Sequence, residues 1–290
     1  MNNILRAMMA KYPMAVSDTD AKNAVKQAIQ EISLCGLGRS DFYQNAAFNG
    51  GTALRIFHGL TRFSEDLDFA IDSENIASFS LGNYVNCINN ELASLGIPAE
   101  FELDSEEGFV KRGYIKGNCR DVLSSFGVEE HLYKKAPSNE ILKVKLEADA
   151  VILTDAMYET KYLLQPYPTP VRLYDQGSLF AGKVAAVLSR GWKNRVKGRD
   201  LYDYLFYINN NFKINLAHLE SRLKNNEYLK FEDKLDETLL KQLLQSKFQE
   251  IDYESAKADV SPFIPDRKTI DFWSAELFSS VTKDYTFIKK

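Results

Sequence analysis

Residues 48–71 constrain the possible fold and function of this chain more than any other segment. They read FNGGTALRIFHGLTRFSEDLDFAI, with a double glycine ahead of two aspartates that stand in an apolar segment. Polar and apolar residues alternate from Asp66 to Ile71, which predicts a strand with one buried face. Asp66 and Asp68 therefore project from the same face, where two like charges repel each other unless a cation compensates them. Magnesium fits best, because it prefers carboxylate oxygens and leaves room for phosphates, although a D-x-D on a solvent-facing strand also arises by chance.

The glycine pair is the second informative feature. Gly50 and Gly51 follow a short apolar stretch at 46–48, expected as a strand, and precede a helical pattern at 52–57. Glycine lets the backbone approach a ligand closely, and the start of a helix offers unpaired N–H donors to a phosphate. The hydroxyl of Thr52 is expected either to cap this helix or to contact a phosphate. Any tight turn could use two glycines, so the pair gains weight from the aspartates that follow.

A third carboxylate would complete a site for two metal ions. Residues 140–151 alternate as a strand, with Lys143, Lys145, Glu147 and Asp149 on one face. Glu147 is the candidate ligand, and Asp149 is the alternative on the same face. A surface strand whose acidic residues offset the two lysines explains the pattern equally well.

A late cluster of charged residues follows a predicted helix at 176–189. Lys183 lies among small and apolar residues of this helix, where a buried ammonium needs a phosphate or carboxylate partner unless its stem reaches solvent. Trp192 could stack on a base within a basic run that suits nucleotide phosphates or an RNA backbone, while a solvated loop is the alternative. Asp200 either caps the next helix or belongs to the site. The basic run consists of Arg190, Lys193, Arg195, Lys197 and Arg199.

The order of the expected elements indicates an α+β fold. Residues 1–170 mix strands with helices, including a helix expected at 76–95, and predict a mixed sheet with flanking helices. A proline-bearing connection, LLQPYPTPVRLYD at 163–175, leads into a mostly helical domain at 171–290.

Charge and cysteine content limit the classes of function. The net charge of −4 produces no global field that attracts nucleic acid, so RNA binding would need a local basic patch. The three cysteines are widely separated and are expected as reduced thiols. No run of about 18 apolar residues is present, so we expect a cytoplasmic protein without a membrane partner.

These segments together resemble a known family. The run NGGTALRIFHGLTRFSEDLDFAI, the strand KVKLEADA and the later GKVAAVLSR and RDLYDYLFY are similar to the AbiEii/AbiGii toxin family of nucleotidyltransferases, within the DNA polymerase β-like superfamily. RFSEDLDF, with Arg62 and Ser64 just before the aspartates, is more specific to this family than D-x-D alone. The resemblance covers about residues 45–210.

The resemblance implies a nucleotidyltransferase-like sheet and a role for each matched residue. Gly51 and Thr52 would contact the triphosphate of an NTP, with Gly50, Arg62 and Ser64 as further nucleotide-binding residues. Asp66 and Asp68 would hold Mg²⁺, with Glu147 as the weaker match to the third carboxylate. Lys183 would contact phosphate, and Asp200 would serve as a base or a ligand near the acceptor.

The family also implies a biological role. Its members are toxins of toxin–antitoxin or phage-defence pairs, beside a separate antitoxin protein, and some are similar to enzymes that add nucleotides to the acceptor end of tRNA. We therefore expect transfer of NMP from an NTP to an acceptor hydroxyl, with tRNA as the leading acceptor. The alternatives are transfer to a protein or a small molecule, and a non-catalytic module that binds nucleotides or a protein partner.

Overall fold

The computed structural model describes residues 2–12, 17–192 and 196–288. The chain forms two compact units. Unit 1 consists of residues 1–57, 63–152 and 160–173, and unit 2 consists of residues 58–62, 153–159 and 174–290. The domain boundary near residue 170 stays a prediction from the sequence.

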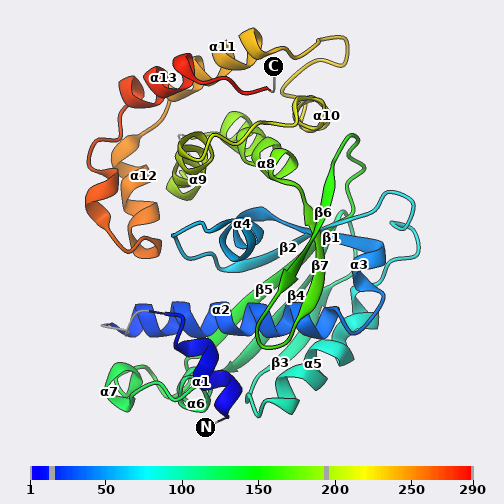
Figure 1. Ribbon diagram of the computed structural model, residues 1–290, viewed down its shortest axis with the longest axis vertical. Helices are drawn as coiled ribbons and strands as arrows, with labels where there is room; N and C mark the ends of the chain where they lie inside the picture. Colours follow the sequence, from blue (N-terminus) through cyan, green and yellow to red (C-terminus); the bar gives the residue numbers. More distant parts are fainter. Residues whose placement is uncertain (1, 13–16, 193–195, 289–290) are drawn as a thin grey trace. The chain divides into compact units, whose positions relative to one another are not determined.

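Unit 1 is built on a mixed sheet of seven strands in the order β3-β4-β5-β2-β1-β7-β6 (Figure 1). β1 pairs antiparallel with β2 and parallel with β7, whereas β2 pairs parallel with β5. This mixed sheet with flanking helices confirms the predicted α+β class. The strands are β1 (Ala46–Asn49), β2 (Asp66–Ile71), β3 (Glu100–Ser105), β4 (Val110–Asn118), β5 (Ile141–Asp149), β6 (Tyr158–Leu163) and β7 (Thr169–Tyr174).

Helices α2 (Asp18–Leu37) and α5 (Val85–Ser94) pack against each other along one face of this sheet (Figure 1). The hydroxyl of Ser17 accepts a hydrogen bond from the N–H of Asp20 and so caps the start of α2. Along β5 the even-numbered side chains are buried beneath these helices, and the odd-numbered ones are more accessible on the opposite face. Unit 1 also contains α1 (Asn3–Met9), α3 (Phe42–Asn45), α6 (Cys119–Ser125), α7 (Glu130–Tyr133) and the 3₁₀ helix η1 (Leu81–Tyr84), while α4 (Gly50–His58) ends at its boundary.

Unit 2 is helical. Its helices are α8 (Gln176–Ser189), α9 (Gly198–Asn209), α10 (Leu216–Asn225), α11 (Glu237–Phe248), α12 (Tyr253–Val260) and α13 (Ala275–Asp284), with the 3₁₀ helices η2 (Ser261–Phe263) and η3 (Arg267–Ile270). The C-terminal tail packs into the core of this unit, because Phe278 and Phe287 are fully buried. The hydroxyls of Tyr204 and Thr282 share a hydrogen bond of 2.6 Å that joins α9 to α13.

Two expectations about the elements were wrong. The helix expected at 76–95 is α-helical only in α5, because the preceding residues form turns in which Ser78 and Ser80 hydrogen-bond locally and to Glu106. The connection at 163–175 contains the end of β6 and all of β7. The prolines of this segment disfavoured a strand in the sequence, yet Val171 and Leu173 of β7 are buried in the sheet. No helix of the described residues is both long and apolar enough to span a membrane.

Candidate functional site

Three strands of unit 1 bring the predicted metal residues into adjacent rows on the open face of the sheet. Strand β2 lies between β1 and β5, and β5 lies between β2 and β4. In one row, Asp68 stands opposite Glu147, which stands opposite Arg112 on β4. In the next row, Asp66 stands opposite Lys145. The structure therefore brings together the carboxylates that the sequence singled out and adds two cations to them.

The double glycine lies directly against the second aspartate. Asn49, the last residue of β1, pairs with Asp68, and Gly50 then turns the chain into α4 with a φ of 76°. A Cβ atom at Gly50 would collide with the carboxylate of Asp68. This position therefore needs glycine for its backbone conformation and for the close approach of the aspartate. The first turn of α4 provides backbone N–H groups without helical partners beside that carboxylate.

Thr52 has a structural contact that the sequence did not suggest. Its side chain is 0% exposed, and its hydroxyl donates a hydrogen bond of 2.5 Å to the carbonyl oxygen of Asp66. This bond fixes α4 to the start of β2, so the hydroxyl neither caps the helix nor faces solvent. Ser64 is half-buried, and its carbonyl oxygen accepts a hydrogen bond from the Gln30 side chain. The nucleotide contacts of Thr52 and Ser64 stay predictions.

The surroundings of Asp68 disfavour its charged form. Burial and the neighbouring Asp66 raise its pKa to about 7, and Lys145 only partly offsets this, while Glu147 and Asp149 add to it. The part that Asp66 contributes is the repulsion that the D-x-D spacing predicted for two carboxylates on one face of a strand. A cation bound beside Asp68 would relieve it, so the chemistry of this pair fits a divalent metal.

Glu147 already has cationic partners. Lys145 Nζ lies 2.8 Å from Glu147 Oε2, and Arg112 Nε lies 2.7 Å from Glu147 Oε1. Although partial burial opposes it, these bonds lower the pKa of Glu147 and keep it charged. Lys145 Nζ also lies 3.4 Å from Asp66 Oδ2. Within the described residues, no three His, Cys, Asp or Glu side chains are grouped so as to hold a metal ion, so the third-ligand role of Glu147 stays a prediction.

In unit 2, the other predicted residues form a buried chain of alternating charges. Lys183 Nζ lies 2.6 Å from Asp200 Oδ1 and 2.7 Å from Asp203 Oδ2. Arg190 Nε lies 2.5 Å from Asp200 Oδ2 at one end of the chain. At the other end, Arg62 donates from Nε and Nη2 to the two oxygens of Asp203, at 2.6 Å each. Lys183 thus has the carboxylate partners that its apolar surroundings required.

These contacts change the interpretation of Arg62 and Asp200. Arg62 is 3% exposed, and it holds Asp203 at a distance suited to two parallel hydrogen bonds. Its nucleotide contact stays a prediction that the burial does not favour. Despite burial, Lys183 and Arg190 lower the pKa of Asp200 to about 2. A carboxylate with so low a pKa is a weak base at neutral pH, so the structure favours an anchoring role for Asp200.

Two described residues of the basic run, and the tryptophan beside them, contact other parts of the chain. Trp192 is 1% exposed and its indole N–H donates to the carbonyl oxygen of Val187, so the prediction that it stacks on a base was wrong. Arg190 pairs with Asp200, and Arg199 lies 4.2 Å from the Phe263 ring centroid. Lys197 precedes α9 and is half-buried. The predictions for Lys193 and Arg195 lie outside the described residues.

Sequence reasoning gave no role to three of these residues. Asp203 stands one helical turn after Asp200, and the R-D-x-x-D spacing was the signal that both carboxylates share a face of α9. Lys145 was visible in the alternation of β5, but it was interpreted only as a surface charge. Arg112 gave no local signal, because its pairing with Glu147 depends on the register of β4 with β5.

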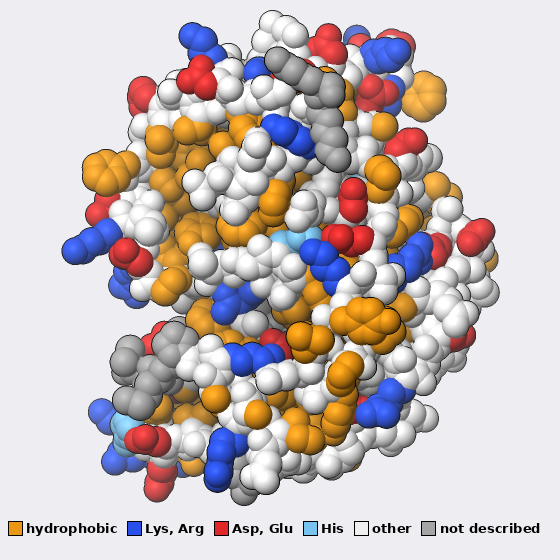
Figure 2. All heavy atoms as spheres, in the orientation of Figure 1, with side chains coloured by type: hydrophobic (Ala, Val, Ile, Leu, Met, Phe, Trp, Pro, Cys, Tyr) orange, Lys and Arg blue, Asp and Glu red, His pale blue; other side chains and the backbone are white. Residues whose placement is uncertain are grey.

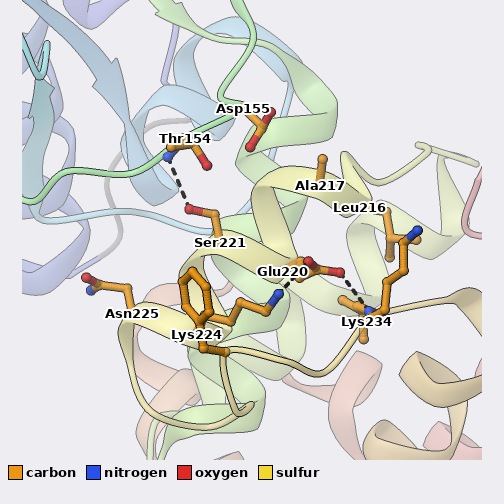
Figure 3. Close-up of a pocket in the computed structure, with 11 residues that line it drawn as sticks. Thr154, Asp155, Leu216, Ala217, Glu220, Ser221, Lys224, Asn225 and Lys234 are labelled. Carbon is orange, nitrogen blue, oxygen red and sulfur yellow. Dashed lines mark hydrogen bonds and ion pairs between the residues drawn. The ribbon is translucent and has the colours of Figure 1, made fainter.

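Charged side chains elsewhere are more evenly spread on the face drawn in Figure 2. Acidic and basic side chains are interspersed over that face, rather than collected into one charged patch. A pocket of ≈ 730 Å³ in unit 2 lies along α10 (Figure 3). Its wall includes Glu220, which accepts hydrogen bonds from Lys224 and from the N–H of Leu235. None of the predicted site residues that the structure describes lines this pocket.

Comparisons with known proteins bear on both the family and the fold. A family model described as nucleotidyl transferase AbiEii toxin, type IV TA system, matches residues 32–276. No curated protein matches the sequence. MenT4, a nucleotidyltransferase toxin from Mycobacterium tuberculosis H37Rv, has a similar structure, with a TM-score of 0.52 and 14% identity over 97% of this chain and 90% of that one. A protein from H. pylori assigned as a nucleotidyltransferase has a TM-score of 0.51 and 16% identity over 89% and 92%. At such identities these two structures inform the fold alone.

Proposed function

The chain belongs to the AbiEii family of nucleotidyl transferase toxins of type IV toxin–antitoxin systems, and we propose that it transfers NMP from an NTP to a tRNA hydroxyl with Mg²⁺ as its cofactor. The observation that carries this proposal is the packing of Gly50 against the carboxylate of Asp68. A helix start and a pair of carboxylates thereby meet where β1 ends beside β2. Nucleotidyl transfer needs a phosphate-binding turn and metal-binding carboxylates next to each other.

Asp66 and Asp68 are the residues that we propose to hold the metal. They share a face of β2, both are half-buried, and burial together with the neighbouring Asp66 raises the pKa of Asp68. Mg²⁺ is commonly held by one or two carboxylates and completes its shell with water and substrate phosphates. When bound, it would neutralise charge on the triphosphate during transfer.

Gly50 and Gly51 are proposed to bind the triphosphate through their backbone. With no side chain at either position, a phosphate could approach the N–H groups of the first turn of α4. The acceptor oxygen would then bond to the α-phosphorus, while the bond from that phosphorus to the oxygen bridging the α- and β-phosphates breaks. Pyrophosphate would leave, and the hydroxyl proton would pass to solvent. Holding the triphosphate and orienting it for this attack is what the turn would contribute.

Lys183 is proposed as a phosphate contact, with Asp200 in support. Asp200 and Asp203 fix the ammonium of Lys183 within unit 2, and they raise its pKa although burial opposes this. Lys183 therefore carries a full positive charge at neutral pH. With its low pKa, Asp200 acts in this proposal by orienting Lys183 and Arg190 rather than by accepting a proton.

The acceptor, the partner and the biological role are the finer parts of the proposal. We propose tRNA because of the family resemblance in the sequence; the contacts of Arg190, Trp192 and Arg199 add no support for RNA binding. Membership of a toxin–antitoxin family implies a cognate antitoxin protein as partner. A role in phage defence follows from the same resemblance and is proposed with it.

The direct test is a labelling assay. Purified protein, Mg²⁺ and total tRNA are incubated with each NTP in turn, labelled at the α-phosphate. The Asp66→Ala/Asp68→Ala variant is tested beside it, and Glu102→Gln serves as a matched control, since Glu102 is an exposed carboxylate of the same sheet that pairs with Lys116. We expect label in tRNA with the wild type and the control, and at least a ~100-fold loss with the double variant.

Each other outcome changes a defined part of the proposal. Transfer that the Asp66→Ala/Asp68→Ala variant retains in full would refute the metal assignment. Label in protein or in a small molecule, with none in tRNA, would replace the acceptor and keep the chemistry. Label in no acceptor would favour the alternative of a binding module.

A further inference from the structure

We propose that Lys145 is a built-in cation of the metal site, which keeps Glu147 out of the metal's coordination and leaves Asp66 and Asp68 as its protein ligands. This inference rests on the metal dependence in the proposed function and specifies which residues of unit 1 carry it. Lys145 contacts both the row of side chains that contains Asp66 and the row that contains Glu147.

Lys145 bridges the row that contains Asp66 and the row that contains Glu147. Its backbone pairs with Asp66 in the parallel register of β2 and β5. From there its ammonium lies 2.8 Å from Glu147 Oε2 and 3.4 Å from Asp66 Oδ2. The positive charge thus stands between two carboxylates, as a metal shared by them would.

Both carboxylate oxygens of Glu147 already accept a hydrogen bond from a cation. Arg112 Nε donates to Oε1 at 2.7 Å, and Lys145 Nζ donates to Oε2 at 2.8 Å. Both bonds are charge-assisted, and such bonds are roughly twice as strong as neutral ones. A metal at either oxygen of Glu147 would lie next to the charge of Arg112 or Lys145, which repels it. Asp68 has no comparable cationic bond among its described contacts, and a bound metal would offset the repulsion from Asp66.

Electrostatics predicts the direction in which metal affinity changes when Lys145 is replaced. The ammonium of Lys145 would repel a divalent ion held by Asp66 and Asp68, because both charges are positive and Lys145 Nζ lies 3.4 Å from Asp66 Oδ2. Removing the charge of Lys145 should therefore tighten metal binding, and should also release Glu147 to coordinate. A lysine that only solvates the face of the sheet would have no such effect.

Binding of Mn²⁺, followed by the EPR signal of the free ion, tests this without any assay of activity. Four variants are compared with the wild type: Lys145→Met, the charge-neutral double variant Lys145→Met/Glu147→Gln, Asp68→Asn, and Lys143→Met. Lys143 is the matched control, because it stands two residues earlier on the same face of β5 and is exposed. Circular dichroism establishes that each variant is folded.

We expect Lys145→Met to bind Mn²⁺ about 10-fold more tightly than the wild type, and Lys143→Met to stay within about 2-fold. The double variant should return to within about 3-fold of the wild type, since a mutually compensating pair has been removed. Asp68→Asn should weaken binding by at least about 10-fold.

Two results would overturn the inference. One is a Lys145→Met variant that binds no more tightly than Lys143→Met. The other is a double variant that loses as much affinity as Asp68→Asn, which would make Glu147 a metal ligand. If no form of the protein binds Mn²⁺, the metal dependence of the proposed function falls, and the inference falls with it.

Discussion

At the scale of single residues, His218 shows how burial fixes a protonation state. Its side chain is 0% exposed, and its Nδ1 lies 2.9 Å from the carbonyl oxygen of Thr154. A carbonyl oxygen only accepts, so Nδ1 carries the proton. Nε2 is buried without a hydrogen-bond partner among the described residues. Protonation at Nε2 would therefore bury a charge that has no hydrogen-bond partner among the described residues and that Asp155 and Asp175 offset only in part.

This arrangement predicts a dependence of stability on pH. Burial, and to a lesser degree the charge of Arg222, lowers the pKa of His218 from 6.5, so the unfolded chain takes up this proton at higher pH than the folded one. The stabilisation is complete above pH 6.5 and is lost as pH falls towards the folded pKa, by at most about 1.4 kcal/mol per pH unit. Urea unfolding between about pH 7.5 and pH 5.5 measures it.

A His218→Asn variant should show a flatter profile over this range than the wild type. His131→Asn is the matched control, because His131 is exposed beside Glu129. Equal slopes for wild type and His218→Asn would contradict the interpretation.

At the scale of elements, local patterns predicted much of unit 1. Alternation in 66–71 and 140–151 gave β2 and β5 to within two residues, since half-buried strands expose every second side chain. The strand predicted at 46–48, from three apolar residues before a glycine turn, is β1 (Ala46–Asn49). The contact of Lys145 with Asp66 was not predictable in the same way. It depends on the parallel register of β2 with β5, which no local pattern specifies.

The junction between β1 and α4 gives a prediction at this scale. Gly50 and Gly59 both have positive φ values, 76° and 80°. A Cβ atom at Gly50 would meet the Asp68 carboxylate, whereas one at Gly59 has nothing within 4 Å. Gly59→Ala therefore isolates the backbone strain, which amounts to about 1–2 kcal/mol for a left-handed residue.

Gly50→Ala should lower stability by more than Gly59→Ala and should also displace Asp68. We expect it to reduce nucleotidyl transfer at least ~100-fold, because a displaced Asp68 would no longer hold the metal in the position that the reaction needs. Gly59→Ala should leave transfer within about 3-fold of the wild type. Chemical unfolding and the labelling assay together measure both effects, and equal losses of transfer in the two variants would show that contact with Asp68 is irrelevant.

At the scale of the whole molecule, segments far apart in the sequence build each unit. Arg62 and Asp203 are separated by 141 positions, yet both belong to unit 2 and form two hydrogen bonds. The R-D-x-x-D run predicted where Asp203 would lie on its helix. It could not predict the partner, because Arg62 stands just before the strand of the D-x-D motif and the family resemblance assigned it to the nucleotide.

Asp203 therefore gives the sharpest prediction about stability. It is 0% exposed and receives hydrogen bonds from both Arg62 and Lys183. Asp203→Asn keeps the shape of the side chain but leaves two buried cations without their shared carboxylate, which should lower the free energy of unfolding by about 3–5 kcal/mol. Asp259→Asn removes a carboxylate that lies 3.8 Å from Arg199 and is 26% exposed, and should cost less than about 1 kcal/mol. Urea denaturation of both variants makes the comparison, and a similar small loss in each would mean that Arg62 and Lys183 find other partners when Asp203 is removed.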